Sequence, residues 1–314
     1  MASAGRLAAF DTPNVRRVLA GAAVLGLALG IQTLVLHLST DPLADVHAYY
    51  DAGSRLNAGL PLYDQPATTN DNEFYRYPPL LAIAFRPLAL LPFETAALIW
   101  EAFLVVCLAL TVVRLGLNRR TLLVMGMLAL PTLWSLAVGQ AQIVVTLLMA
   151  LGAPWALALA ANLKIFPALA AIWWLGRRDL RSVGWFVVWL AALTVVQFVL
   201  EPAGTLAFPS TFGLQEVGNV ENRSLYAYAP VAWAIAVAVG VAVTWRLAPT
   251  KYGWIAAVAL SVFATPRLLL YQLSTLVAGL REPATAPGTP AGAVTRTAAA
   301  PAIARNTPPP DVHR

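Results

Sequence analysis

Acidic side chains are most concentrated in one polar segment, residues 41–79, which lies between two long apolar stretches. In a chain made mostly of apolar residues, a loop rich in acids and tyrosines is where catalytic or binding groups are expected. A proton-accepting carboxylate is the chemistry that such a segment offers most directly. The segment contains six of the fifteen acidic residues: Asp41, Asp45, Asp51, Asp64, Asp71 and Glu73.

Helical spacing separates two of these acids. Asp41 and Pro42 are typical of a helix start, and Gly59 followed by Pro61 is typical of a helix end. The predicted helix places Asp45, Tyr49, Ala52 and Leu56 on one face, and His47, Tyr50, Asp51 and Arg55 on another. Asp45 is then either a solvated loop acid or a general base, whereas pairing with His47 or Arg55 favours a structural role for Asp51.

Two cations interrupt apolar sequence elsewhere in the chain. Lys164 follows Asn162 and precedes Pro167, and Arg267 follows Pro266. Each is either a charge that extends to the membrane interface or a ligand for an anion such as a lipid phosphate. Arg86 and Glu101 also interrupt apolar runs, and they are interpreted as packing or interface charges.

Composition predicts an integral membrane protein. The 314 residues are 59% hydrophobic and 11% charged, whereas roughly a quarter of a soluble domain is charged. The net charge of +6 is spread over short loops, so it indicates membrane topology and argues against nucleic-acid binding. One cysteine, Cys107, three scattered histidines and the lack of nucleotide-binding, HExxH or GxSxG motifs predict neither a metal site nor a cofactor.

The elements that must position these residues are apolar helices. Spans are predicted at 18–38, 93–115, 121–138, 182–200 and 226–248, with shorter apolar segments at 79–91, 252–264 and 268–280. The stretch 143–176 is expected to break near 152–154 and 162–167, and such breaks occur in membranes only where they are buried or line a cavity. The predicted fold is an all-α, polytopic transmembrane helical bundle of about seven or eight spans, with interfacial helices in the first outer loop.

Basic clusters predict the orientation. They precede the span at 18–38 and flank the loops near 114–120 and 177–181, so these loops are expected in the cytoplasm. The N-terminus is then cytoplasmic, and segments 41–79 and 201–224 lie on the extracytoplasmic face of the plasma membrane. The first span is longer than a signal-peptide core and is expected to remain as an anchor. Residues 1–280 form the predicted membrane domain, and 281–314, rich in Pro, Ala and Thr, a disordered tail.

Several sequence pieces occur in an order that resembles a known enzyme family. They are DVHAYYDAGSRLNAGLPLYD, YRYPPLLAIAFRPLALLP, GQAQ, LAANLKIFPAL before GRRDLR, ENRSL and TPRLLLYQL. With these pieces, residues 16–280 resemble the polyprenyl-phosphate-mannose-dependent mannosyltransferases of glycosyltransferase family 87, which have the GT-C architecture.

The resemblance implies transfer of a hexose, mannose by family, from a polyprenyl-phosphate sugar to a hydroxyl of a lipid or glycan acceptor, with inversion and without a metal or other cofactor. It implies that Asp45 is the catalytic base and that Lys164 and Arg267 bind the donor phosphate. Two alternatives remain open: a transporter or flippase of lipid-linked glycans, and a non-catalytic relative with a shortened C-terminal end. The substrate-binding residues predicted with it are Tyr49, Tyr50, Arg76, Tyr77, Gln140 and Asn222.

Overall fold

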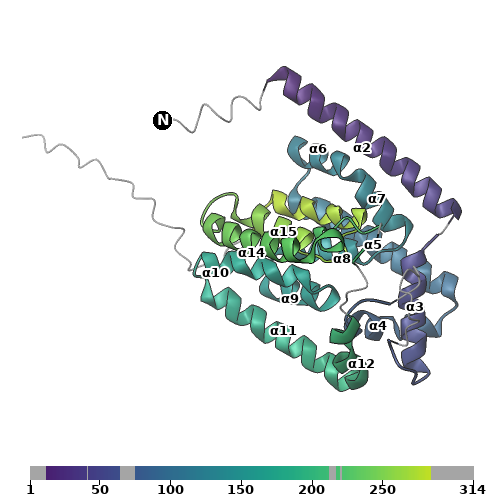
Figure 1. The fold of residues 1–314 in the computed structure, drawn as a ribbon. Coiled ribbons are helices and arrows are strands. Elements are labelled where there is room, and N and C mark those ends of the chain that lie inside the picture. The colour runs from purple at the N-terminus through teal and green to yellow at the C-terminus, as the bar shows by residue number, and fades with distance from the viewer. Residues whose placement is uncertain (1–11, 41, 64–74, 212–216, 220, 284–314) are drawn as a thin grey trace, which may run out of the picture. The chain divides into compact units, whose positions relative to one another are not determined.

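The computed structural model describes residues 12–40, 42–63, 75–211, 217–219 and 221–283, and all regular structure in these ranges is helical (Figure 1). The predicted all-α class is confirmed. Asp41, predicted as a helix cap, lies outside the described residues, as does the predicted tail from residue 284 onward.

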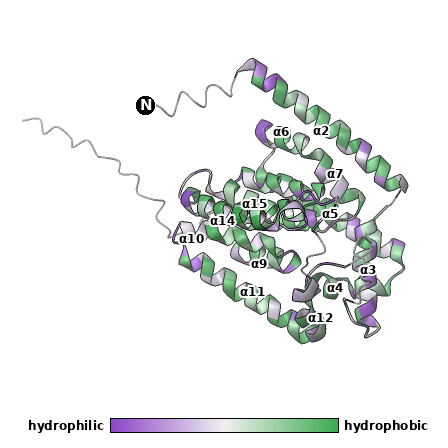
Figure 2. Ribbon diagram, in the orientation of Figure 1, coloured by the Kyte–Doolittle hydropathy of each residue, from purple (hydrophilic) through white to green (hydrophobic). Residues whose placement is uncertain are grey.

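Four described helices are long and apolar enough to cross a membrane: α2 (Pro13–Thr40), α5 (Phe93–Leu115), α11 (Leu180–Leu200) and α14 (Pro230–Leu247). Figure 2 shows α2, α11 and α14 as mostly hydrophobic, which fits contact with lipid. These helices confirm a polytopic helical membrane protein, while the count of seven or eight spans stays a prediction.

The predicted span at 121–138 is not one straight helix. Its residues belong to α6 (Arg119–Met127) and α7 (Ala129–Ala137), which meet at a bend of 62°. Both helices pack closely on α2 through small residues. A Cβ atom added to Gly126 would lie 2.8 Å from the Cβ of Ala23, and one added to Gly30 would lie 2.8 Å from the carbonyl carbon of Ala129. Close docking to α2 therefore accompanies the bend.

Both breaks predicted within 143–176 are confirmed. The segment forms α8 (Gln142–Leu151), α9 (Pro154–Leu163), η3 (Phe166–Ala171) and α10 (Ile172–Gly176). Gly152 ends α8 with a left-handed φ of 59°, and Lys164 is extended at the end of α9. The helices α15 (Gly253–Phe263) and η6 (Leu270–Leu280) pack against this broken segment and complete the core.

The polar segment after α2 forms α3 (Ala44–Asn57), and α4 (Pro79–Phe85) and η2 (Leu88–Leu90) follow it. The predicted start of α3 is wrong, because Leu43, with φ 60°, precedes its first residue. Docking explains the change: the amides of Leu43 and Asp45 donate to the carbonyls of Ala137 and Val138 at the end of α7, over 3.1 and 3.0 Å.

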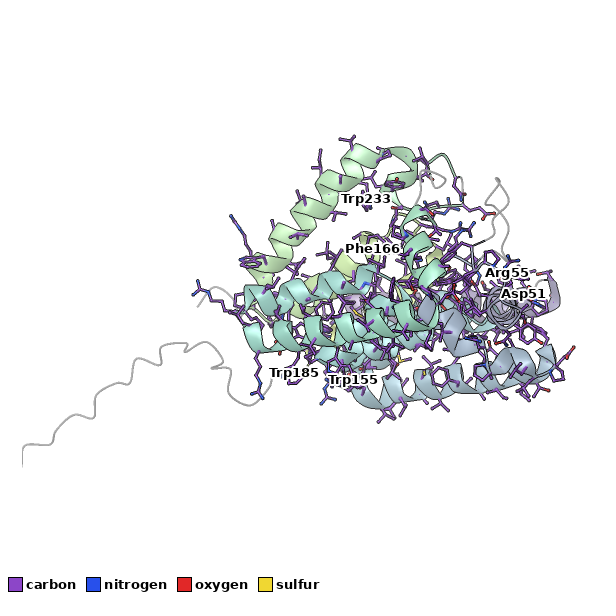
Figure 3. All side chains as sticks on the ribbon, turned by 90° about the horizontal axis from the view of Figure 1, so that it is seen from below. Asp51, Arg55, Trp155, Phe166, Trp185 and Trp233 are labelled. Atoms are coloured by element: carbon purple, nitrogen blue, oxygen red, sulfur yellow. The ribbon has the colours of Figure 1, made fainter. Side chains whose placement is uncertain are left out.

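The predicted division of α3 into two faces is confirmed. Tyr49, Ala52 and Leu56 are buried, whereas Asp51 is exposed and Arg55 is partly exposed (Figure 3). The second polar segment, 201–224, contains α12 (Pro202–Ala207) and η4 (Phe208–Thr211), and α13 (Leu225–Tyr228) follows it. In Figure 1, α3, α4 and α12 lie at one end of the bundle and α10 lies at the other.

Candidate functional site

A cavity of about 560 Å³ lies where the start of α3, the turn before α4, the break between α9 and η3, and the segment before η6 meet. This volume is in the range of pockets that bind small molecules. Five of the predicted site residues line it, although they come from four separate parts of the sequence: Asp45, Arg76, Tyr77, Lys164 and Arg267.

Asp45 occupies the first turn of α3, is half-buried and lines the cavity. Burial raises the pKa of this carboxyl from 3.8 to about 6, while the positive charges of Lys164 and Arg267, the Gln140 side chain and the charge of Arg76 act in the opposite direction. At neutral pH Asp45 is therefore mostly ionised, with a greater proton affinity than an ordinary aspartate. That combination suits a general base.

Gln140 lies behind the cavity wall, in the turn between α7 and α8. Its Oε1 atom accepts hydrogen bonds from the hydroxyl groups of Tyr49 (2.8 Å) and Tyr77 (3.0 Å). The Tyr49 hydroxyl also accepts a bond of 3.2 Å from the amide of Ala141. Gly139 has a φ of 69°, and a side chain there would clash with Val46 of α3. Tyr49 and Gln140 are thus a buried support that positions Tyr77 beside Asp45.

Lys164 is held at the cavity by uncharged partners. Its Nζ atom donates to Gln142 Oε1 over 2.7 Å, and Gln142 Nε2 donates to Thr275 Oγ1 over 2.6 Å. The same Nζ atom lies 5.1 Å from the ring centre of Tyr77 and 5.3 Å from that of Tyr271. These contacts fix the position of the amino group, whose protonated form would pair with an anionic ligand.

Arg267 lies on a segment that Asn222 holds from both sides. Asn222 Nδ2 donates to the carbonyl of Pro266 over 2.6 Å, and its Oδ1 accepts from the amide of Leu268 over 2.9 Å. The amide of Arg223 also donates to the Leu268 carbonyl, over 2.8 Å. Because Asn222 is fully buried, its position fits support of the Arg267 backbone and not a surface that contacts substrate.

The structure therefore divides the nine predicted site residues into five that line the cavity and four that do not. Tyr49, Gln140 and Asn222 are buried behind the wall. Tyr50 is away from the cavity lining, where its hydroxyl donates to the carbonyl of Leu91 over 2.7 Å. A direct contact of these four residues with substrate stays a prediction.

Sequence reasoning missed several residues of the wall. Gln142 is next to Lys164, and its place in GQAQ, two residues after the predicted Gln140, was the pattern that pointed to it. His37 also lines the cavity, and its position as a polar residue at the end of the first apolar segment could have indicated this. In the described ranges, no group of three or more His, Cys, Asp or Glu side chains is arranged to hold a metal ion. The other polar or aromatic residues of the lining are Trp134, Phe166, Phe208, Thr211, Glu221, Arg223, Ser261, Thr265, Tyr271, Gln272 and Thr275.

Comparison with known proteins shows which family this chain belongs to. The model of glycosyltransferase family 87 matches residues 74–280, which include Arg76, Lys164 and Arg267. The chain belongs to glycosyltransferase family 87. Asp45 precedes the matched region.

One curated relative is the polyprenol-phosphate-mannose-dependent alpha-(1-2)-phosphatidylinositol pentamannoside mannosyltransferase of Mycolicibacterium smegmatis. The two sequences are 31% identical over 160 residues, which cover 44% of this chain and 39% of the relative. The match thus spans about two fifths of the relative's length. No solved structure matches the chain.

Proposed function

We propose that this family 87 glycosyltransferase moves a hexose, mannose in the first instance, from a polyprenyl-phosphate sugar to a hydroxyl of a lipid or glycan acceptor. One observation carries the proposal: a carboxylate with a raised pKa and three cations, Lys164, Arg267 and Arg76, face one cavity. The relative's name supports polyprenol-phosphate-mannose as the donor.

In the proposed reaction, the Asp45 carboxylate takes the proton of the acceptor hydroxyl. The acceptor oxygen forms a bond to the anomeric carbon as the bond from that carbon to the phosphate oxygen breaks. The electron pair of the broken bond leaves with the lipid phosphate. Attack from the face opposite the phosphate inverts the anomeric configuration.

The cations act on the leaving group. A lipid phosphate gains negative charge as it departs, and fixed positive groups in a site shielded from water stabilise that charge strongly. Lys164 is held by Gln142, and the backbone around Arg267 is held by Asn222. Both cations are therefore positioned before the donor binds, so the reaction needs little rearrangement of the protein.

The site is proposed to face outward from the plasma membrane, with the N-terminus in the cytoplasm. The helices next to the cavity, α3 and α4, lie at the end of the bundle opposite α10 (Figure 1). The basic cluster Arg177, Arg178 and Arg181 begins directly after α10, and such clusters favour the cytoplasmic side.

The test is a transfer assay in membranes with labelled polyprenyl-phosphate mannose and chemical identification of the glycosylated product. Asp45→Asn is expected to abolish transfer while the amount of inserted protein is unchanged. The matched control is Asp51→Asn, because Asp51 is on the same helix but exposed on the other face. Full transfer by Asp45→Asn would remove the base assignment, and movement of the donor across the membrane without any product would favour a transporter.

A further inference from the structure

Two residues of the cavity wall bury a polar atom that has no hydrogen-bond partner among the described residues: Gln272 at Oε1 and His37 at Nδ1. Leaving a buried polar group unpaired costs free energy, so native structures rarely do it without a reason. Because both residues border the same cavity, a bound molecule with hydroxyl groups would satisfy both atoms.

The orientation of Gln272 is determined by its other hydrogen bond. Gln272 Nε2 donates to the backbone carbonyl of Arg267 over 3.1 Å, and the residue is only 8% exposed. Exchanging the two ends of the amide would place two acceptor oxygens against each other. The unpaired atom is therefore the acceptor oxygen, and it requires a donor such as an O–H group.

Between these two residues the wall is aromatic. The ring of His37 stacks on Trp134 with centres 5.1 Å apart and planes 25° apart, and Trp134 meets Tyr271 edge-on at 6.4 Å. Trp134 is one helical turn before Val138, whose carbonyl binds the backbone amide of Asp45. The aromatic wall thus adjoins the residue proposed to accept the proton of the acceptor hydroxyl.

We propose that His37, Trp134, Tyr271 and Gln272 form a subsite for a sugar ring of the acceptor. A sugar ring presents an apolar C–H face to aromatic side chains and a rim of hydroxyl groups to polar atoms, which matches this wall. Gln272 Oε1 accepts a hydrogen bond from one hydroxyl, and His37 Nδ1 pairs with another. The acceptor is therefore a glycoside and not a simple lipid alcohol. This inference rests on the proposed function.

The test uses the full chain in nanodiscs, hexyl glycosides of mannose and glucose, their singly deoxygenated analogues, and hexanol. Wild type is expected to prefer a glycoside over hexanol. Gln272→Leu is expected to raise the KM of the glycoside about tenfold, the size expected for loss of one hydrogen bond. Because leucine also removes the bond to the Arg267 carbonyl, the KM of the donor is measured in parallel. For one deoxygenated analogue, kcat/KM with wild type should be about tenfold lower than for the parent glycoside. With Gln272→Leu, the same analogue and the parent glycoside should have equal kcat/KM.

His37→Phe keeps the stacking on Trp134 and removes Nδ1. Wild type should discriminate against a second deoxygenated analogue, which lacks the hydroxyl that pairs with His37, and His37→Phe should not. The control is His47→Phe, because His47 stacks on Phe93 away from the cavity lining. Equal use of hexanol and glycosides, or equal losses from every analogue in wild type and Gln272→Leu, would overturn the subsite.

Calorimetric binding of the glycosides separates this inference from the proposed function. If wild type transfers no sugar to any acceptor, the proposed function fails. Glycoside binding that Gln272→Leu weakens about tenfold would still support the subsite, whereas unchanged binding would refute it.

Discussion

The pH dependence of sugar transfer tests the proposed base most directly. Burial raises the pKa of Asp45 to about 6, and only the ionised carboxylate can accept a proton. The ionised share is then about 9% at pH 5 and about 91% at pH 7, so kcat/KM should rise about tenfold between these values. An aspartate with the usual pKa of 3.8 would already be about 94% ionised at pH 5, and the rate would hardly change.

A lysine variant tests the cause of this pKa. The positive charge of Lys164 lowers the pKa of Asp45, so Lys164→Gln should move the midpoint of the pH profile upward, whatever it does to the maximal rate. The control is Lys251→Gln, because Lys251 is exposed and lies over the ring of Tyr252. That variant should keep the wild-type midpoint.

The assay measures initial transfer rates between pH 4.5 and 8.5 with saturating donor. A phosphodiester donor keeps one negative charge throughout this range, so the acid limb belongs to the protein. His37 also borders the cavity, and His37→Phe should lower kcat/KM while leaving the midpoint in place. A wild-type profile that is flat between pH 5 and 7, or an unchanged midpoint in Lys164→Gln, would refute the reasoning.

Three further predictions concern the support of the cavity. Asp45→Asn should raise the unfolding free energy at pH 7.5 by up to about 3 kcal/mol, because the raised pKa means that the ionised carboxylate destabilises the native state above pH 6. This gain should shrink toward pH 4. A difference in thermal unfolding that does not depend on pH would contradict the prediction. Gly139→Ala should reduce transfer at least tenfold, because the left-handed backbone and the contact with Val46 leave no room for a side chain. The control Gly21→Ala should be neutral, because the space around Gly21 is open. Equal activity of the two variants would count against the role of Gln140 in supporting Tyr77. Asn222→Ala should raise the KM of the donor, because it frees the backbone around Arg267. The control Asn118→Ala removes the cap of α6, so it should cost about 1 kcal/mol of stability and leave the KM of the donor unchanged. The same donor KM in both variants would contradict the support role of Asn222.

Local patterns in the sequence anticipated much of the fold. Helix α5 has the predicted bounds, and the breaks at Gly152 and Lys164 lie where glycine, proline and polar residues interrupt apolar sequence. The start of α3 could not be predicted in this way. There the carbonyls at the end of α7 bind the backbone of Leu43 and Asp45, and this distant contact prevailed over the cap expected from Asp41 and Pro42.

The same limit applies to the site. The two glutamines of GQAQ look equivalent in sequence, as do Tyr49 and Tyr77. Yet Tyr77 and Gln142 line the cavity, while Tyr49 and Gln140 are buried behind it. Which side chain reaches the cavity depends on how α3, α8 and η6 dock. The unpaired atoms of His37 and Gln272 are likewise visible only in three dimensions.

The sequence by itself determined that this chain is a helical membrane protein, that Asp45 and Asp51 are on different faces of one helix, and that Lys164 and Arg267 are exceptional cations. These properties follow from composition and from the helical period, which act between near neighbours. Only the tertiary structure decided that Asp45 meets those cations in one cavity and that its pKa is raised. Both depend on segments far apart in the chain that exclude water from the same place, and no local pattern encodes that packing.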